Sequence, residues 1–202
     1  MIKNMIFDMG NVLMSFSPEY ILSHFTQDLD TIKVLKESIF YSGLWASLDN
    51  GDVSFDDACE VALKRCPMID PAIIKELFST WYHYKIEDKS MTELVKKLKE
   101  HGYKIYLCSN AAPLFHTYKD TYDVFQYFDG LLISGDINIS KPDKAIYEYL
   151  LNHFDIIGQE SLFIDDSLAN IQAASSLGIH TFHYTGSLEA FKKTLHNLNL
   201  LP

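Results

Sequence analysis

The chain alternates short apolar runs with segments of helical spacing, and this alternation limits the folds that are open to it. The first run, Met5 to Leu13, contains one carboxylate, Asp8, which a turn at Gly10 follows. Continuous apolar runs are typical of parallel strands that are buried on both faces. Strands that alternate with helices predict right-handed crossovers and a parallel sheet covered on both sides. The predicted fold class is therefore α/β.

Four further strands are predicted after residue 100, and polar residues follow two of them. The strands are Tyr103–Cys108, Gly130–Ser134, Ser161–Ile164 and Ile179–Phe182. Ser109 and Asn110 close the first of these, Asp165 and Asp166 close the third, and Lys141 opens a helix between them. The carboxyl ends of parallel strands share one edge of a sheet, and the helices that follow begin at the same edge. We therefore expect all five residues to meet the carboxylate of the first strand there.

Between about residues 15 and 85 the strand-like runs give way to helical spacing. Helix starts are predicted at Ser17, Ser54 and Asp70, each a capping residue ahead of a helical pattern, and a further helix is predicted over Leu29 to Phe40. Residues 43–45 are interpreted as a break and residues 49–52 as a turn. Residues 90–93 are interpreted as a capping box that opens the next helix. We predict a helical bundle over residues 15–85, inserted into a sheet domain of residues 1–14 and 86–202.

Composition excludes several classes of function. A formal net charge of -10 argues against binding to nucleic acid or to an anionic membrane surface. No apolar run is long enough to span a bilayer, and the first strand begins so early that we expect no signal peptide. The three cysteines lack metal-type spacing, and their odd number favours a reducing, cytoplasmic setting. We expect a monomer or a weak homodimer.

The residue types at the predicted sheet edge suit phosphoryl chemistry. Mg²⁺ prefers oxygen ligands and uses one or two protein carboxylates together with substrate phosphate oxygens and water. Asp8 and Asp165 can supply the carboxylates, and the backbone carbonyl of Gly10 can supply a third ligand. Each residue alone also has a structural interpretation, because such residues often cap helices and form turns. Their joint placement at one edge favours a functional site.

Four motifs in this order resemble those of the haloacid dehalogenase-like (HAD) hydrolases. They are Asp8-Met9-Gly10-Asn11-Val12, Ser109-Asn110, Lys141-Pro142, and Phe163-Ile164-Asp165-Asp166 with Asn170 and Ala173-Ala174 in the next helix. The resemblance spans nearly the whole chain. It is greatest to the small phosphatases that carry a helical cap after the first motif, including sugar-phosphate phosphatases with an Asp-x-Gly-Asn-Val signature. It implies a Rossmann-like sheet core with an inserted α-helical bundle as cap.

The resemblance also implies a role for each motif residue. Asp8 would be the nucleophile that forms an aspartyl-phosphate, and covalent catalysis of this kind divides one difficult displacement into two easier ones. Ser109 and the backbone amide of Asn110 would hold the phosphoryl group, and Lys141 would offset its charge. Asp165 would bind Mg²⁺ with Asp8 and the Gly10 carbonyl. Asp166 would orient the metal's waters or Lys141 from outside the ligand set.

Gly10 departs from the family pattern. Phosphatases of this family commonly carry a second aspartate at this position, which protonates the leaving group, and a general acid is worth about 10²–10⁴-fold in rate. A leaving group that is already acidic, such as the anomeric oxygen of a sugar 1-phosphate, depends less on such a proton. Alternatively a substrate hydroxyl, a cap residue or a metal-bound water supplies it. The expected substrate is a small phosphorylated metabolite, most simply a sugar phosphate.

Two other functions remain open at this point. The 2-haloacid dehalogenases also lack the second aspartate and need no metal, because a halide leaves without a proton. A non-catalytic binding module of the same fold is the other alternative, although Asp8 and Lys141 are both retained.

An insertion directly after the nucleophile strand is placed to cover the site and select the substrate. Within it Trp45 could present an aromatic face to a sugar, or it could belong to the core of the bundle.

Overall fold

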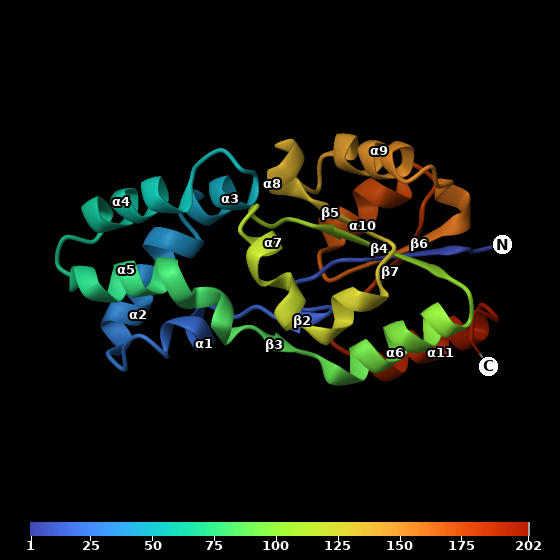
Figure 1. The fold of residues 1–202 in the computed structure, drawn as a ribbon, viewed down its shortest axis with the longest axis horizontal. Helices are drawn as coiled ribbons and strands as arrows, with labels where there is room; N and C mark the ends of the chain where they lie inside the picture. Colours follow the sequence, from blue (N-terminus) through green and yellow to red (C-terminus); the bar gives the residue numbers. More distant parts are fainter. Residues whose placement is uncertain (202) are drawn as a thin grey trace.

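A five-stranded parallel sheet lies at the centre of the computed structural model, which describes residues 1–201. Its strands are β1 (Asn4–Phe7), β4 (Lys104–Ser109), β5 (Gly130–Ile133), β6 (Ser161–Asp165) and β7 (His180–His183). They pair in the order β5-β4-β1-β6-β7, all parallel, so that β1 is the central strand (Figure 1). The α/β fold class predicted from the sequence is confirmed. The last residue of the predicted 86–202 range lies outside the described residues.

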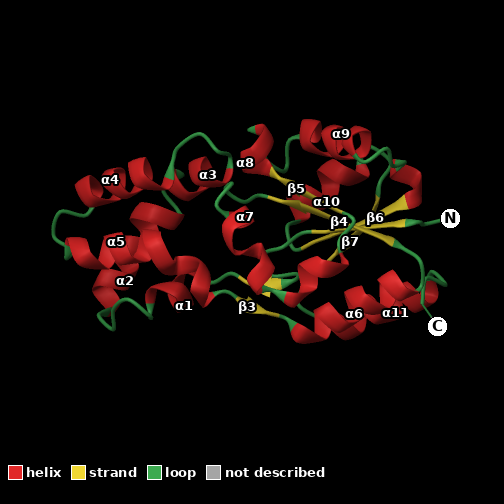
Figure 2. Ribbon diagram, viewed as in Figure 1, coloured by secondary structure: helices red, strands yellow, loops and turns green. Residues whose placement is uncertain are grey.

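Helices cover both faces of this sheet (Figures 1 and 2). One face carries α6 (Lys89–Glu100) and α11 (Leu188–Asn197), and the other carries α9 (Lys144–His153) and α10 (Leu168–Ser175). Successive side chains of a strand point to opposite faces. Met5 and Phe7 therefore pack with Phe191 of α11, whereas Ile6 packs with Ile146 of α9 and Ile171 of α10. The central strand is apolar throughout because both of its faces are buried.

A second group of helices forms a body of its own, which we call the helical unit (residues 16–85). Its elements are α1 (Pro18–Leu22), α2 (Leu29–Leu35), the π-helix η1 (Lys36–Phe40), α3 (Leu44–Asp49), α4 (Phe55–Arg65), α5 (Pro71–Thr80) and the 3₁₀-helix η2 (Trp81–Tyr84). Ser17, Ser54 and Asp70 cap α1, α4 and α5 through their side chains, as predicted. The apolar side chains of the helical unit form a separate cluster around Trp45 and Trp81.

The helical unit joins the sheet through a two-stranded ribbon. Its strands are β2 (Met14–Ser15) and β3 (Ile86–Glu87), which pair antiparallel. The ribbon begins at Met14, six residues after Asp8, and the chain comes back from the helical unit through β3, which pairs with β2. This arrangement keeps the helical unit next to the end of β1 (Figure 1). The division of the chain at about residues 15 and 85 remains a proposal about independent domains.

The local structure differs from the sequence-based expectation at three places. A short helix that was not predicted, α3, lies between the predicted break at residues 43–45 and the predicted turn at residues 49–52; Gly43 precedes it with a positive φ of 85°, and residues 50 and 51 form a turn. Helix α6 is capped by Asp88, which accepts hydrogen bonds from the amides of Ser90 and Met91, so residues 90–93 lie inside the helix and form no capping box. A short helix, α8 (Ser134–Ile137), follows β5 where no helix was predicted. One-turn elements such as α3 and α8 depend on packing, because short helices are marginal alone.

The remaining short elements lie between β4 and β6. They are α7 (Phe115–Tyr118) and the 3₁₀-helices η3 (Lys119–Thr121), η4 (Asp123–Tyr127) and η5 (Gly158–Glu160). Within residues 1–201 no helix combines the length and the apolar character that crossing a membrane requires.

Three hydrogen bonds join the C-terminal end of α3 to the segment that follows β5, and we call them the clasp. The hydroxyl of Ser134 donates to the backbone carbonyl of Asp49. The Asn138 side chain donates to the Asn50 carbonyl at 2.9 Å, and the Ser140 hydroxyl donates to the Asn50 side chain at 2.7 Å. The clasp therefore fixes the helical unit against the loop that leads into Lys141.

Replacing Gly51 with alanine should weaken the clasp. Gly51 and Gly43 share a positive φ, 75° and 85°, where an L-residue costs about 1–2 kcal/mol. A Cβ at Gly51 would also lie 2.5 Å from the carbonyl oxygen of Gly135, whereas one at Gly43 would meet nothing within 4 Å. Urea denaturation should show a clearly larger loss of unfolding free energy for Gly51→Ala than for Gly43→Ala. Equal losses would contradict the importance of this close approach.

Candidate active site

The ends of two neighbouring strands place the first two predicted site residues side by side. Phe7 pairs with Ile164 in the register of β1 and β6, and each strand runs directly into its aspartate. The amide of Asp8 donates to the Ile164 carbonyl at 2.9 Å, which fixes the start of the loop after β1. Asp8 and Asp165 are therefore brought to the same sheet edge, as the parallel topology requires.

Lys141 joins the two carboxylates. Its ammonium lies 2.6 Å from Oδ1 of Asp8 and 2.7 Å from Oδ2 of Asp165, and its side chain is only 2% exposed. Asn110 holds the lysine backbone from both sides: its Oδ1 accepts from the Lys141 amide at 2.8 Å, and its Nδ2 donates to the Lys141 carbonyl at 2.9 Å. The side chain of Asn110 thus positions Lys141, a task that the sequence did not indicate.

Asp165 is fully buried and is also held by its neighbours in the chain. Its Oδ1 accepts from the Ser167 amide at 2.8 Å, and the Asn170 side chain donates to both carboxylate oxygens at 3.0 and 3.1 Å. With the Lys141 contact these bonds compensate for the loss of water around a buried charge. The orientation of this carboxylate is therefore set by α10 and by the lysine together.

The site has the donor set of a divalent-cation site. Asp8, Asp165 and Asp166 each offer a carboxylate oxygen, and these oxygens lie within 4.8 Å of one another. Asp166 is held by the Asn11 side chain, which donates to its Oδ2 at 3.0 Å. An all-oxygen cluster with two or more carboxylates fits Mg²⁺ rather than a softer metal. The Gly10 carbonyl, in the turn directly after Asp8, is the remaining predicted ligand.

Burial and charge act in opposite directions on the ionisation of this cluster. Burial raises the pKa of Asp8 to about 6, because a carboxylate loses its hydration; Lys141 opposes this shift and Asp165 adds to it. Burial would lower the pKa of Lys141, but the two carboxylates hold it above its ordinary value. Lys141 therefore stays a cation, and its charge keeps Asp8 available as an anion near neutral pH.

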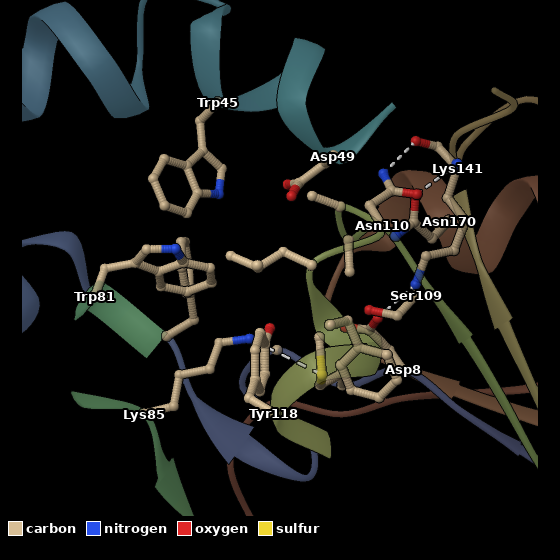
Figure 3. Close-up of a pocket in the computed structure, with 17 residues that line it drawn as sticks. Asp8, Trp45, Asp49, Trp81, Lys85, Ser109, Asn110, Tyr118, Lys141 and Asn170 are labelled. Atoms are coloured by element: carbon tan, nitrogen blue, oxygen red, sulfur yellow. Dashed lines mark hydrogen bonds and ion pairs between the residues drawn. The ribbon is translucent and has the colours of Figure 1, made fainter. Parts of the chain in front are cut away.

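A cavity of about 130 Å³ opens in front of Asp8, between the sheet edge and the helical unit. Figure 3 shows Asp8, Ser109 and Lys141 on one side of it and aromatic side chains on the other. Ser109, at the end of β4, is almost completely buried and lines the cavity. Trp45 also lines the cavity, and its ring stacks on that of Phe40 with 4.4 Å between the ring centroids. It therefore belongs to the core of the helical unit, and its contact with a sugar stays a prediction.

The helical unit contributes three polar groups that sequence analysis did not single out. Asp49, at the end of α3, and Lys85, just before β3, both line the cavity (Figure 3). The indole nitrogen of Trp81 is buried and has no hydrogen-bond partner among the described residues. Asp49 had been interpreted as part of a turn, and Lys85 follows an aromatic run without any motif. Neither residue carries a local signal that could have identified it.

The chain was compared with known proteins. The model of the haloacid dehalogenase-like hydrolase family matches residues 2–178. A sesquiterpene phosphatase of Aspergillus oryzae is 32% identical over 187 residues, which cover 92% of this chain and 91% of that protein. A D-ribitol-5-phosphate phosphatase of Bacteroides thetaiotaomicron is 25% identical over 194 residues, which cover 90% of this chain and 91% of that protein.

A solved structure has the same fold. It is that of a HAD family enzyme from Bacteroides thetaiotaomicron in complex with magnesium and inorganic phosphate, which covers 94% of this chain and 98% of its own. The two structures superpose with a TM-score of 0.76 at 23% sequence identity. The arrangement of the sheet and of the helical unit is therefore shared with an enzyme of this family.

Lys141→Met should destabilise the protein by leaving two buried carboxylates without their cation, a loss of about 3–5 kcal/mol at pH 8 without divalent ions. Without Lys141, burial and Asp165 raise the pKa of Asp8 above its value in the unfolded chain, so the folded form binds more protons and the loss should shrink at pH 5. Urea denaturation in EDTA at both pH values measures this. Lys144→Met, which removes an exposed lysine three residues later, is the control; equal losses in both variants would contradict the interpretation.

Proposed function

The chain belongs to the haloacid dehalogenase-like hydrolases, and within this family we propose that it is a Mg²⁺-dependent phosphatase. Its substrate is a small sugar phosphate, such as a sugar 1-phosphate, and the reaction passes through an aspartyl-phosphate on Asp8. The observation that carries this proposal is the buried Lys141 ammonium, which contacts Asp8 and Asp165 at once beside a cavity. A cation so placed can offset the charge of a nucleophile and a phosphoryl group together.

Each residue of the sheet edge then has a task. Asp8 attacks phosphorus, while Lys141 stabilises the negative charge that gathers around it. Ser109 and the amide of Asn110 bind phosphoryl oxygens at the cavity wall. Mg²⁺, held by Asp8, Asp165 and the Gly10 carbonyl, would neutralise charge on the phosphoryl group. Outside this ligand set, Asp166 would orient the waters of the metal, and Asn11 fixes its carboxylate.

The helical unit is proposed to act as a cap that selects the group attached to phosphate. Its contribution to the cavity combines aromatic rings, Trp45 among them, with two buried donors, the Lys85 ammonium and the Trp81 indole N–H. Oxygen atoms of a sugar can accept from both donors, whereas a hydrocarbon would leave them unsatisfied at a cost in free energy. Rings that face a sugar also pack against its C–H faces, as in many pockets of mixed character.

The alternatives are less compatible with this site. A dehalogenase reaction makes no use of three carboxylates gathered within 4.8 Å. A binding module would not need a carboxylate held between a buried ammonium and an open cavity. An isoprenoid phosphate is the second candidate substrate, because the 32% identical relative is named a sesquiterpene phosphatase and the cavity is lined by rings.

Asp8→Asn should abolish phosphate release from sugar phosphates, by about 10³-fold or more, because it removes the nucleophile. EDTA should abolish the activity of the unchanged protein, and added Mg²⁺ should restore it. A phosphate-release assay measures both effects. Asp120→Asn, which changes an aspartate whose side chain is 85% exposed, is the control and should keep full activity. Metal-independent release of halide from 2-chloropropionate would instead favour the dehalogenase alternative.

Trp81→Phe should keep an aromatic ring in the cavity while removing the unsatisfied N–H. One hydrogen bond to a sugar oxygen is worth about 0.5–1.5 kcal/mol, so kcat/KM for sugar phosphates should fall about 2–12-fold. Activity on farnesyl phosphate, whose hydrocarbon cannot accept from the N–H, should stay the same or rise. Steady-state kinetics on both substrates measures the difference. A higher kcat/KM for farnesyl phosphate than for every sugar phosphate in the unchanged protein would reject the sugar specificity.

A further inference from the structure

We propose that Asp49 of the helical unit is the general acid of this active site. It would protonate the leaving group, which Gly10 cannot do because it has no side chain. The inference rests on the proposed phosphatase function. Displacing an alkoxide from phosphorus without a proton is slow, and Gly10 offers only its backbone beside Asp8. A carboxyl group that enters the cavity from the opposite wall can reach the leaving oxygen, which points away from the nucleophile in an in-line displacement.

The cavity places Asp49 across from the nucleophile. Asp8 and Asp49 both line it, one from the end of β1 and the other from the end of α3. Figure 3 shows the Asp49 carboxyl directed into the space between Trp45 and Asn110, above Asp8 and Ser109. A group bound to phosphate at Asp8 must extend into this space, because the sheet edge closes the other side. The leaving oxygen therefore lies between the two aspartates.

The clasp fixes Asp49 relative to the sheet rather than to the helical unit alone. The Asp49 carbonyl accepts from Ser134, and the next residue, Asn50, is bound by Asn138 and Ser140. Ser140 directly precedes Lys141, so one loop positions both the cation at the nucleophile and the carboxyl opposite it. A general acid needs this kind of placement, because proton transfer falls off steeply with distance.

The surroundings of Asp49 favour a carboxyl that holds its proton at neutral pH. Burial raises the pKa of Asp49 to about 8, with Lys85 opposing this shift and Asp8 adding to it. The other titratable groups that line this cavity are Asp8, Lys85, Lys141 and Tyr118, and burial raises the pKa of Tyr118 far above the neutral range. A carboxylic acid with its pKa near the working pH can both donate and recover a proton.

Lys85 is better suited to stabilise the product of this transfer than to donate the proton itself. Its ammonium lies 5.1 Å from the centroid of the Trp81 ring and 5.7 Å from those of Phe16 and Tyr118, and its nearest polar contact is the Met9 sulfur at 3.9 Å. Rings around a cation favour its charged form. Burial lowers the pKa of Lys85 to about 8, against the opposing effect of the Asp49 and Asp8 charges, so a pH measurement has to separate the lysine from Asp49. Once Asp49 has given up its proton, the resulting carboxylate faces this ammonium, which lowers the cost of the transfer.

The two half-reactions balance. In the first, an Asp8 oxygen forms a bond to phosphorus, the bond from phosphorus to the leaving oxygen breaks, and that oxygen takes the proton of Asp49 to leave as an alcohol. In the second, water attacks the phosphorus of the aspartyl-phosphate and gives one proton to the Asp49 carboxylate. Inorganic phosphate leaves, and Asp8 and Asp49 return to their starting forms. No oxidant, reductant or further co-reactant is needed.

The test compares leaving groups in Asp49→Asn, which keeps the size of the side chain and the backbone bonds of the clasp. With Mg²⁺ present, kcat/KM should fall about 10²–10⁴-fold for alkyl phosphates and for sugar phosphates esterified at an ordinary alcohol, because these leaving groups need a proton, and it should fall less for a sugar 1-phosphate. For p-nitrophenyl phosphate, whose leaving group departs as a stable anion, it should change only a few-fold. The ratio of the two substrates does not depend on the fraction of folded protein, so partial misfolding cannot imitate this result.

A second measurement uses pH. In the unchanged protein, kcat/KM for sugar phosphates should fall as pH rises through about 8, because Asp49 loses its proton there. This alkaline fall should disappear in Asp49→Asn and persist in Lys85→Met. Persistence in Asp49→Asn together with disappearance in Lys85→Met would overturn the proposal and identify the lysine as the donor.

The outcomes also separate this proposal from the one on which it rests. An equal loss on sugar phosphates and p-nitrophenyl phosphate in Asp49→Asn would overturn the general-acid role while leaving the phosphatase intact. If the unchanged protein releases phosphate from no monoester, or releases it equally in Asp8→Asn, both proposals fall.

Discussion

The Lys141 ammonium between two buried carboxylates is the interaction on which the rest of the structure depends. Removing three charges from water is costly, and the cost is recovered only with close contacts, here 2.6 and 2.7 Å, and with further hydrogen bonds to each partner. Four separate parts of the chain supply them: the ends of β1, β4 and β6 and the loop before α9. Only a parallel sheet with β1 at its centre brings these ends together.

The helical unit forms the second wall of the cavity, opposite the sheet edge. The sheet edge supplies the carboxylates, the hydroxyl and the lysine, which lie at the ends of β1, β4 and β6 and in the loop before α9. The helical unit supplies rings, two buried donors and a carboxyl, which line the cavity opposite the sheet edge. Because β2 and β3 pair shortly after the end of β1, this second wall lies next to Asp8, and the clasp fixes its distance.

Much of the sheet and of its polar edge could be predicted from the sequence. Continuous apolar runs mark buried strands, and a parallel sheet has one carboxyl edge, so the convergence of Asp8, Lys141 and Asp165 followed from their positions alone. Local rules were less reliable in short elements. Asp88 caps α6 where residues 90–93 offered an alternative start, and α3 forms where glycine suggested a break, because packing outweighs propensity in one turn of helix.

The sequence by itself determined the fold class, the order of the motifs and the edge at which they meet, because strand periodicity and helix caps are local properties. Only the tertiary structure decided that Asp49 and Lys85 line the same cavity as Asp8 and that Asn110 holds Lys141 rather than pointing freely into the cavity. It also raised the pKa of Asp8 and of Asp49, since the ionisation of a carboxyl depends on burial and on charges that lie far away in the sequence.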